Sequence, residues 1–85
     1  MNELVEQKFK RLKTNEALKK ELMRLSDEDA YITGTYILMV WKHVNLRNLF
    51  ISLINSDVEV FEKFNRYSLT IPRNEALEPE GDNYA

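Results

Sequence analysis

Side chains able to do acid–base chemistry are few in this sequence of 85 residues, which holds one histidine and no cysteine. His43 is the single conventional base, and it follows Lys42 at the expected end of a helix, where the helix dipole favours a cationic side chain. The two glycines, Gly34 and Gly81, do not belong to a glycine-rich loop that could cradle a phosphate. The sequence therefore indicates a non-enzymatic protein without a cofactor, in which His43 is a helix-end residue.

Three consecutive carboxylates, Asp27, Glu28 and Asp29, could in principle bind a cation. The run lacks the alternating ligands and the glycine of a calcium loop. It directly follows Ser26, and a serine followed by acidic residues is typical of a helix start, because the hydroxyl caps free backbone N–H groups and the dipole favours negative charge. We expect a helix to begin here and no metal to bind.

Phosphate contact is the chemistry that residues 1–25 could provide. They contain seven Lys or Arg and four Asp or Glu, a net charge of +3, whereas residues 68–85 have a net charge of −3. The basic residues that a nucleic acid would contact are Lys8, Lys10, Arg11, Lys13 and Lys20. Glutamates are interleaved with them, including the i,i+4 pair of Glu6 and Lys10, so a salt-bridged, solvated face is favoured and nucleic-acid binding is the alternative.

Apolar spacing predicts the helices that would position these side chains. The stripe of the N-terminal segment changes phase at Thr14 and Asn15, which favours a break between two helices. Residues 30–55 contain no acidic residue and sixteen apolar or aromatic ones. We expect a central helix and then a third helix here, although the β-forming residues and Gly34 in residues 31–41 leave a strand open as an alternative.

A short fourth helix is predicted to begin at Ser56 or Asp57. Both residue types cap helices, and an apolar series at helical spacing follows them. The expected inner face of this helix contains Val58, Phe61 and Phe64.

The fourth helix should end near Tyr67. The next residues are expected to be extended, because the residue before Pro72 is pushed out of the helical region. The sequence thus predicts one all-α domain, a small bundle of three to four helices in residues 1–67. An extended or disordered acidic tail should follow in residues 68–85.

The apolar content of residues 30–54 exceeds what the narrow stripes of the flanking helices can cover, and no disulfide can compensate. A surplus of this kind usually enters a subunit or partner interface. We therefore expect a homodimer that acts as a small regulator or inhibitor and binds another protein, with Tyr84 in a docking segment. The residues expected at the interface, or in the helix packing that supports it, are Ala30, Gly34, Ile37 and Trp41.

No segment has the length of a membrane span. The longest strongly apolar run, residues 36–41, has six residues, far fewer than the roughly twenty that cross a bilayer. Charges interrupt residues 1–25 every few positions, unlike the unbroken apolar region of a secretory signal. We expect no membrane span and a cytoplasmic location.

Overall fold

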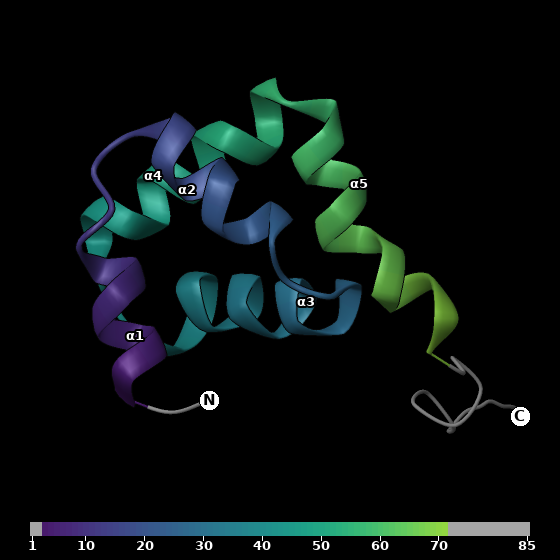
Figure 1. The fold of residues 1–85 in the computed structure, drawn as a ribbon, viewed down its shortest axis with the longest axis horizontal. Coiled ribbons are helices and arrows are strands. Elements are labelled where there is room, and N and C mark those ends of the chain that lie inside the picture. Colours follow the sequence, from purple (N-terminus) through teal and green to yellow (C-terminus); the bar gives the residue numbers. More distant parts are fainter. Residues whose placement is uncertain (1–2, 72–85) are drawn as a thin grey trace, which may run out of the picture.

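The computed structural model describes residues 3–71, and within that range all regular structure is helical. The elements, shown in Figure 1, are α1 Glu3–Lys10, α2 Asn15–Met23, α3 Asp27–Thr35, η1 Tyr36–Val40, α4 Val44–Ser56, α5 Val58–Arg66 and η2 Tyr67–Thr70. The segment η1 is a π-helical continuation of α3, and η2 is a 3-10 helix that extends α5. The predicted all-α fold is confirmed for these residues, with five α-helices instead of three to four.

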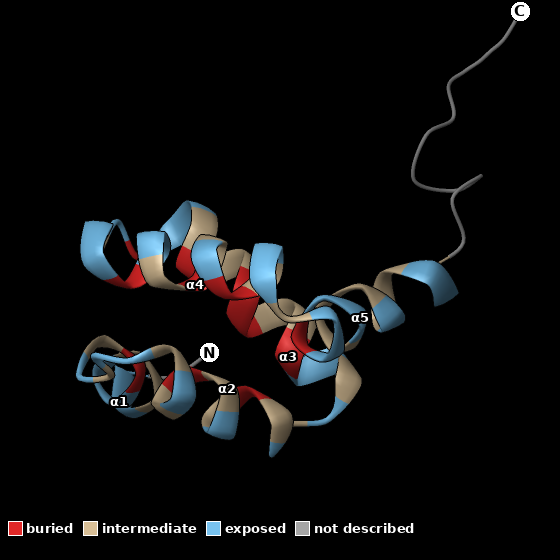
Figure 2. Ribbon diagram, turned by 90° about the horizontal axis from the view of Figure 1, so that it is seen from above, coloured by how far each residue is buried: buried red, intermediate tan, exposed pale blue. Residues whose placement is uncertain are grey.

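The helices enclose one core. In Figure 2, α1 and α2 lie on one side and α4 on the other, with buried positions turned toward the space between them. The apolar residues of the core are Phe9, Leu18, Leu22, Ile37, Trp41, Leu46, Phe50, Leu53 and Val60. Because α1, α2, α4, α5 and η1 all contribute to this cluster, the described residues pack as a single unit.

Side-chain caps explain where three helices begin. The hydroxyl of Thr14 accepts a hydrogen bond from the backbone N–H of Ala17 at 3.1 Å, so the predicted break before α2 is confirmed. Ser26 accepts from the N–H of Asp29 at 3.1 Å, which confirms the predicted start of α3. Asp57 is the cap of α5. Each cap satisfies a backbone donor that the helix itself leaves free.

The central helix differs from its prediction at its C-terminal end. Residues 31–40 are helical, so the alternative of a strand is wrong, and the N–H of Trp41 closes η1 by donating to the carbonyl of Tyr36 at 2.8 Å. Lys42 then adopts a left-handed backbone conformation, with a φ of 54°. His43 is the N-cap of α4, where its Nδ1 accepts from the N–H of Leu46 at 3.1 Å. The prediction that His43 ends the central helix is therefore wrong.

The inner face of α5 also differs from its prediction. Val58 and Phe61 are exposed, whereas Val60 is buried and Phe64 packs against the core. The reason is that Gly34 of α3 leaves room for the ring of Phe64, and this contact sets the rotation of α5.

The segment after α5 stays helical for longer than expected. The hydroxyl of Ser68 donates to the carbonyl of Asn65, and that of Thr70 donates to the carbonyl of Tyr67, both at 2.7 Å. The prediction of an extended chain is wrong for residues 68–70, which form η2 with Tyr67. The remainder of the predicted tail, residues 72–85, lies outside the described residues. No helix within residues 3–71 is long and apolar enough to cross a membrane.

Candidate interaction surfaces

The residues predicted at an interface lie inside the core of the single chain. Those with little or no exposed surface are Ala30, Gly34, Ile37 and Trp41. A Cβ atom added to Gly34 would lie 2.6 Å from Cδ1 of Phe64 and 2.8 Å from Cζ of Phe50. The helix that approaches Gly34 closely is thus the chain's own α5. In the single chain these four residues serve helix packing, which is one of the two roles expected for them.

The residues predicted to contact nucleic acid divide into two groups. Lys8 Nζ lies 3.0 Å from Oε1 of Glu21, and Lys10 pairs with Glu6. The hydrogen bond from Lys8 lowers the pKa of the Glu21 carboxyl from its usual value. The other three of these predicted residues, Arg11, Lys13 and Lys20, are exposed and form no ion pair within residues 3–71. These three are split between α2 and the turn that precedes it, so they do not line one continuous helix.

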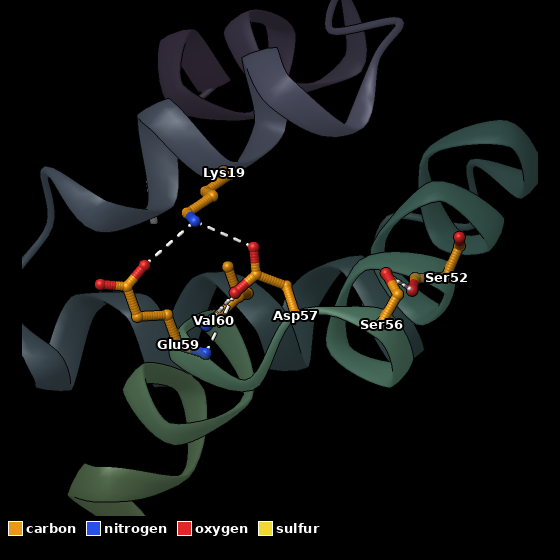
Figure 3. A network of polar contacts seen from close by, with 6 residues as sticks. All are labelled: Lys19, Ser52, Ser56, Asp57, Glu59 and Val60. Atoms are coloured by element: carbon orange, nitrogen blue, oxygen red, sulfur yellow. Dashed lines mark hydrogen bonds and ion pairs between the residues drawn. The ribbon is translucent and has the colours of Figure 1, made fainter.

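A network of charges joins α2 to the start of α5 (Figure 3). Lys19 Nζ lies 2.9 Å from Oδ2 of Asp57 and 3.0 Å from Oε1 of Glu59. The other oxygen of Asp57 accepts from the backbone N–H groups of Glu59 and Val60, at 3.0 and 3.3 Å. The hydrogen bond between Lys19 and Asp57 raises the pKa of the ammonium and lowers that of the carboxyl. Asp57 therefore caps α5 and anchors it to α2.

A second set of contacts joins α5 to α3. Lys63 Nζ lies 3.2 Å from Oδ1 of Asp27, and Nη1 of Arg66 lies 3.4 Å from the same oxygen. Tyr31 of α3 also stacks on Phe64, with ring centroids 5.7 Å apart. Ion pairs and ring contacts thus hold α5 in one rotation, which decides which of its side chains face outward.

Several chemistry-bearing groups of the described residues take part in contacts that hold the fold. The Nδ1 atom of His43 is engaged in capping α4. Within residues 3–71, no group of three or more His, Asp or Glu side chains is placed to hold a metal ion. Lys19, Asp57 and Glu59 stabilise the fold by the contacts described above.

Within residues 3–71, two surfaces expose several large apolar side chains, and one of them is the outer side of α5 and η2. Val58, Phe61 and Leu69 are 70%, 46% and 72% exposed. Two shallow hollows adjoin the ring of Phe61. A hollow of about 360 Å³ is lined by Ile54, Asn55, Ser56, Asp57, Val58 and Phe61. A hollow of about 270 Å³ is lined by Phe61, Glu62, Asn65, Arg66 and Leu69. We call Val58, Phe61, Glu62, Arg66 and Leu69 the α5 face.

The turn from η1 into α4 carries the other apolar surface. Met39, Val40 and Val44 are 73%, 51% and 68% exposed. Lys42 and Arg47 are exposed beside them, and neither forms an ion pair within residues 3–71. We call these five residues the η1–α4 corner. In Figure 1 the corner and α5 lie toward opposite ends of the long axis.

Neither surface was predicted from the sequence, although each has a signal there. Positions 58, 61, 65 and 69 are spaced by three or four residues, as one face of a helix requires, but Val60 and Phe64 offer a competing stripe. The corner is the part of residues 30–55 where two cations interrupt the apolar run. Only the packing of α5 and the turn at Lys42 show which of these side chains remain exposed.

Comparison with protein-family models, with curated proteins and with solved structures gives no match to this chain. Its function therefore has to be inferred from its own surfaces. Among the residues that the structure describes, the α5 face and the η1–α4 corner are the two surfaces that expose several large apolar side chains, and they differ in charge.

Proposed function

We propose that the protein is a non-enzymatic protein-interaction module, a small dimeric regulator or inhibitor that binds another protein. The α5 face joins it to a second copy of itself. The observation that carries this proposal is the exposed ring of Phe61 between two hollows, with Val58 and Leu69 exposed on the same side. Contiguous exposed apolar side chains rimmed by polar ones are typical of protein interfaces.

The charges of the α5 face favour a second copy as the occupant. Glu62 and Arg66 are four residues apart, and both line the hollow beside Phe61. When two copies of a helix pack antiparallel about a two-fold axis, positions near one end lie opposite positions near the other. Glu62 of each copy then lies opposite Arg66 of the other, so the face is complementary to itself. Each Phe61 ring can enter the hollow above Asn65 of the other copy.

The solution mass tests this proposal. Light scattering over a hundredfold concentration range should give the mass of a dimer at the upper end. Phe61→Glu should give a monomer, because it places two new carboxylates, one from each copy, in the apolar contact of the dimer. Leu4→Glu is the matched control, since Leu4 is 76% exposed and lies on α1, outside the face. A wild-type monomer at every concentration, or a Phe61→Glu dimer, would contradict the proposal.

Nucleic-acid binding is a second candidate function, favoured by the exposure of Arg11, Lys13 and Lys20 without ion pairs in residues 3–71. It predicts an affinity that falls steeply with salt and is lost in the double variant Arg11→Glu, Lys13→Glu. Absence of binding to duplex and single-stranded DNA and RNA at low salt would exclude it.

A further inference from the structure

The apolar part of the η1–α4 corner consists of three aliphatic side chains around one turn. Met39 and Val40 end η1, Val44 begins α4, and all three are more than half exposed. The aromatic residue between them, Trp41, is only 8% exposed, because its ring packs against Phe9 and Tyr36 in the core. The corner thus presents a small aliphatic surface next to a tryptophan that is packed in the core.

The charged part of the corner has one sign. Lys42 and Arg47 lie in a segment, residues 30–55, that contains no acidic residue. Some cations of the described surface, such as Lys8, Lys19 and Lys63, lie within 3.2 Å of a carboxylate oxygen, whereas Arg11, Lys13 and Lys20 do not. The two corner cations have no such neighbour in residues 3–71. A positive site without internal neutralisation favours an acidic ligand.

The backbone holds these groups in place. Nε of Arg47 donates to the carbonyl of Leu38 at 3.3 Å, which fixes the guanidinium beside the end of η1. Lys42 is held in the left-handed region, and His43 caps α4 immediately after it. Left-handed conformations in residues other than glycine cost free energy, and π-helical turns are rare; both recur at functional sites. The corner is therefore preorganised for binding.

We propose that the η1–α4 corner binds an acidic amphipathic helix of a protein partner. Its aliphatic side would cover Met39, Val40 and Val44, and its carboxylates would pair with Lys42 and Arg47. This inference deepens the proposed function and rests on it, because it assigns the surface with which the module binds a protein other than itself. A second copy does not fit here, since two corners face to face would bring four cations together.

An anionic membrane fits this corner less well than an acidic helix. Lipid-binding surfaces typically combine roughly four to eight basic residues, or exposed aromatic anchors at the bilayer interface. The corner has two cations, and Trp41 is buried.

The chain contains its own reporter for the test, because Trp41 is its only tryptophan and directly precedes Lys42. The probe is a synthetic helical peptide with leucine on one face and glutamate on the other, titrated into the full chain while Trp41 fluorescence is recorded. We expect a saturable change whose apparent affinity decreases with added salt. A peptide with lysine in place of glutamate should produce none.

Matched variants locate the site. Lys42→Glu should weaken peptide binding by at least about tenfold, because it replaces attraction by repulsion at the centre of the corner. Val44→Ser should weaken binding through loss of apolar contact, without a change of charge. Lys20→Glu has the same charge change at an exposed position of α2 and should bind as the wild type does. Equal affinity of Lys42→Glu and Lys20→Glu would overturn the proposal.

Two further results separate this inference from the proposed dimer. Phe61→Glu should still bind the peptide, because the α5 face lies away from the corner. If the wild-type protein binds the peptide but is monomeric at every concentration, only the proposed self-association is refuted. Lack of a response to the acidic peptide, together with tight binding to vesicles containing phosphatidylserine, would overturn the inference and identify the corner as a membrane contact.

Discussion

The α5 face and the η1–α4 corner each expose three large apolar side chains, yet their charges differ. Glu62 and Arg66 give the α5 face one charge of each sign, whereas Lys42 and Arg47 give the corner two positive charges. Both surfaces gain from being covered, because exposed apolar groups favour association regardless of the partner. We propose that the charges select the partner: a copy of the same chain for the α5 face, and an acidic segment for the corner.

The two regions also differ in the contacts that fix their conformation. The α5 face depends on contacts distant in sequence, in which Lys19 anchors Asp57, Lys63 pairs with Asp27, and Phe64 fills the space above Gly34. The hydrogen bonds of the corner join residues at most nine positions apart, and the ring of Trp41 beneath it packs against Phe9 in the core. Changes in the ion pairs should therefore disturb the α5 face before they disturb the corner.

The largest expected effect comes from Gly34→Leu, which fills the space on α3 against which Phe64 of α5 packs. The new side chain would overlap the rings of Phe64 and Phe50, and overpacking of this kind should lower the free energy of unfolding by about 3 kcal/mol. Urea unfolding followed by circular dichroism measures the loss. Asn48→Leu, at an exposed position of α4, is the control and should change stability little. A Gly34→Leu chain with unchanged mass and melting temperature would show that α5 does not need this contact.

Exchanging the charges of the α5 face should have the next largest effect. Glu62→Arg and Arg66→Glu each place like charges opposite one another, and each should weaken the dimer by about 1 kcal/mol. The double exchange restores opposite charges and should regain most of that loss. Sedimentation equilibrium measures the dimer dissociation constants. Because Arg66 also contacts Asp27, the melting temperature of each variant is needed as a control. Failure of the double variant to recover would argue against the antiparallel pairing.

Acid should loosen the anchor of α5. The pKa of Asp57 is lowered in the folded chain by its hydrogen bond with Lys19, so its stabilising contribution is present above the ordinary carboxyl pKa and is lost as the pH falls through the lowered value. Glu21 behaves in the same way through Lys8. Melting temperatures measured from neutral to acidic pH should therefore fall less steeply for Asp57→Asn than for the wild type. Parallel curves would indicate that the network contributes nothing.

Alkaline pH should weaken the same ion pair of Lys19 and Asp57, because it deprotonates the lysine. The pKa of Lys19 is raised above 10.5 by Asp57, so its contribution is complete below that value and is lost as the pH rises through the higher folded-state pKa. Lys19→Ala should remove this alkaline loss, whereas Lys20→Ala, on the exposed side of α2, should retain it.

The smallest effect is expected at the corner, where Lys42→Gly should raise the stability of the chain and lower its affinity for the acidic peptide. Glycine adopts a φ of 54° without the penalty that a lysine incurs, so the variant should gain up to about 1 kcal/mol of stability. It should also bind the acidic peptide more weakly, because one of the two cations is lost. Asn48→Gly, within α4, should instead lose roughly 0.3–0.5 kcal/mol, because asparagine is itself a weak helix former. A less stable Lys42→Gly chain would mean that the turn needs the lysine side chain.

Helix starts could be predicted because their causes are local. Thr14, Ser26 and Asp57 cap helices with side chains that act on backbone groups two or three residues away. The cap of α4 could not be predicted in this way, because histidine is not a typical cap and no local signal marks the left-handed turn at Lys42.

The exposed surfaces could not be predicted because they depend on tertiary contacts. Both stripes of α5 are apolar, and the sequence alone does not tell whether Phe61 or Phe64 is the outer ring. Because Gly34 has no side chain, the ring of Phe64 packs against it, and this rotation of α5 leaves Phe61 facing outward. The apolar surplus in residues 30–54 predicted that Gly34 and Trp41 serve an interface or the helix packing that supports it, and in the single chain both residues are buried against Phe64, Phe50 and Phe9.

Dilution of isotope-labelled protein, followed by amide NMR signals assigned to individual residues, tests the difference between the two surfaces most directly. We predict that signals from α5 and η2 shift over a hundredfold dilution, as dimers dissociate, and that signals from residues 39–47 stay in place. Shifts confined to residues 39–47, or no shifts at any position, would contradict the assignment of self-association to the α5 face.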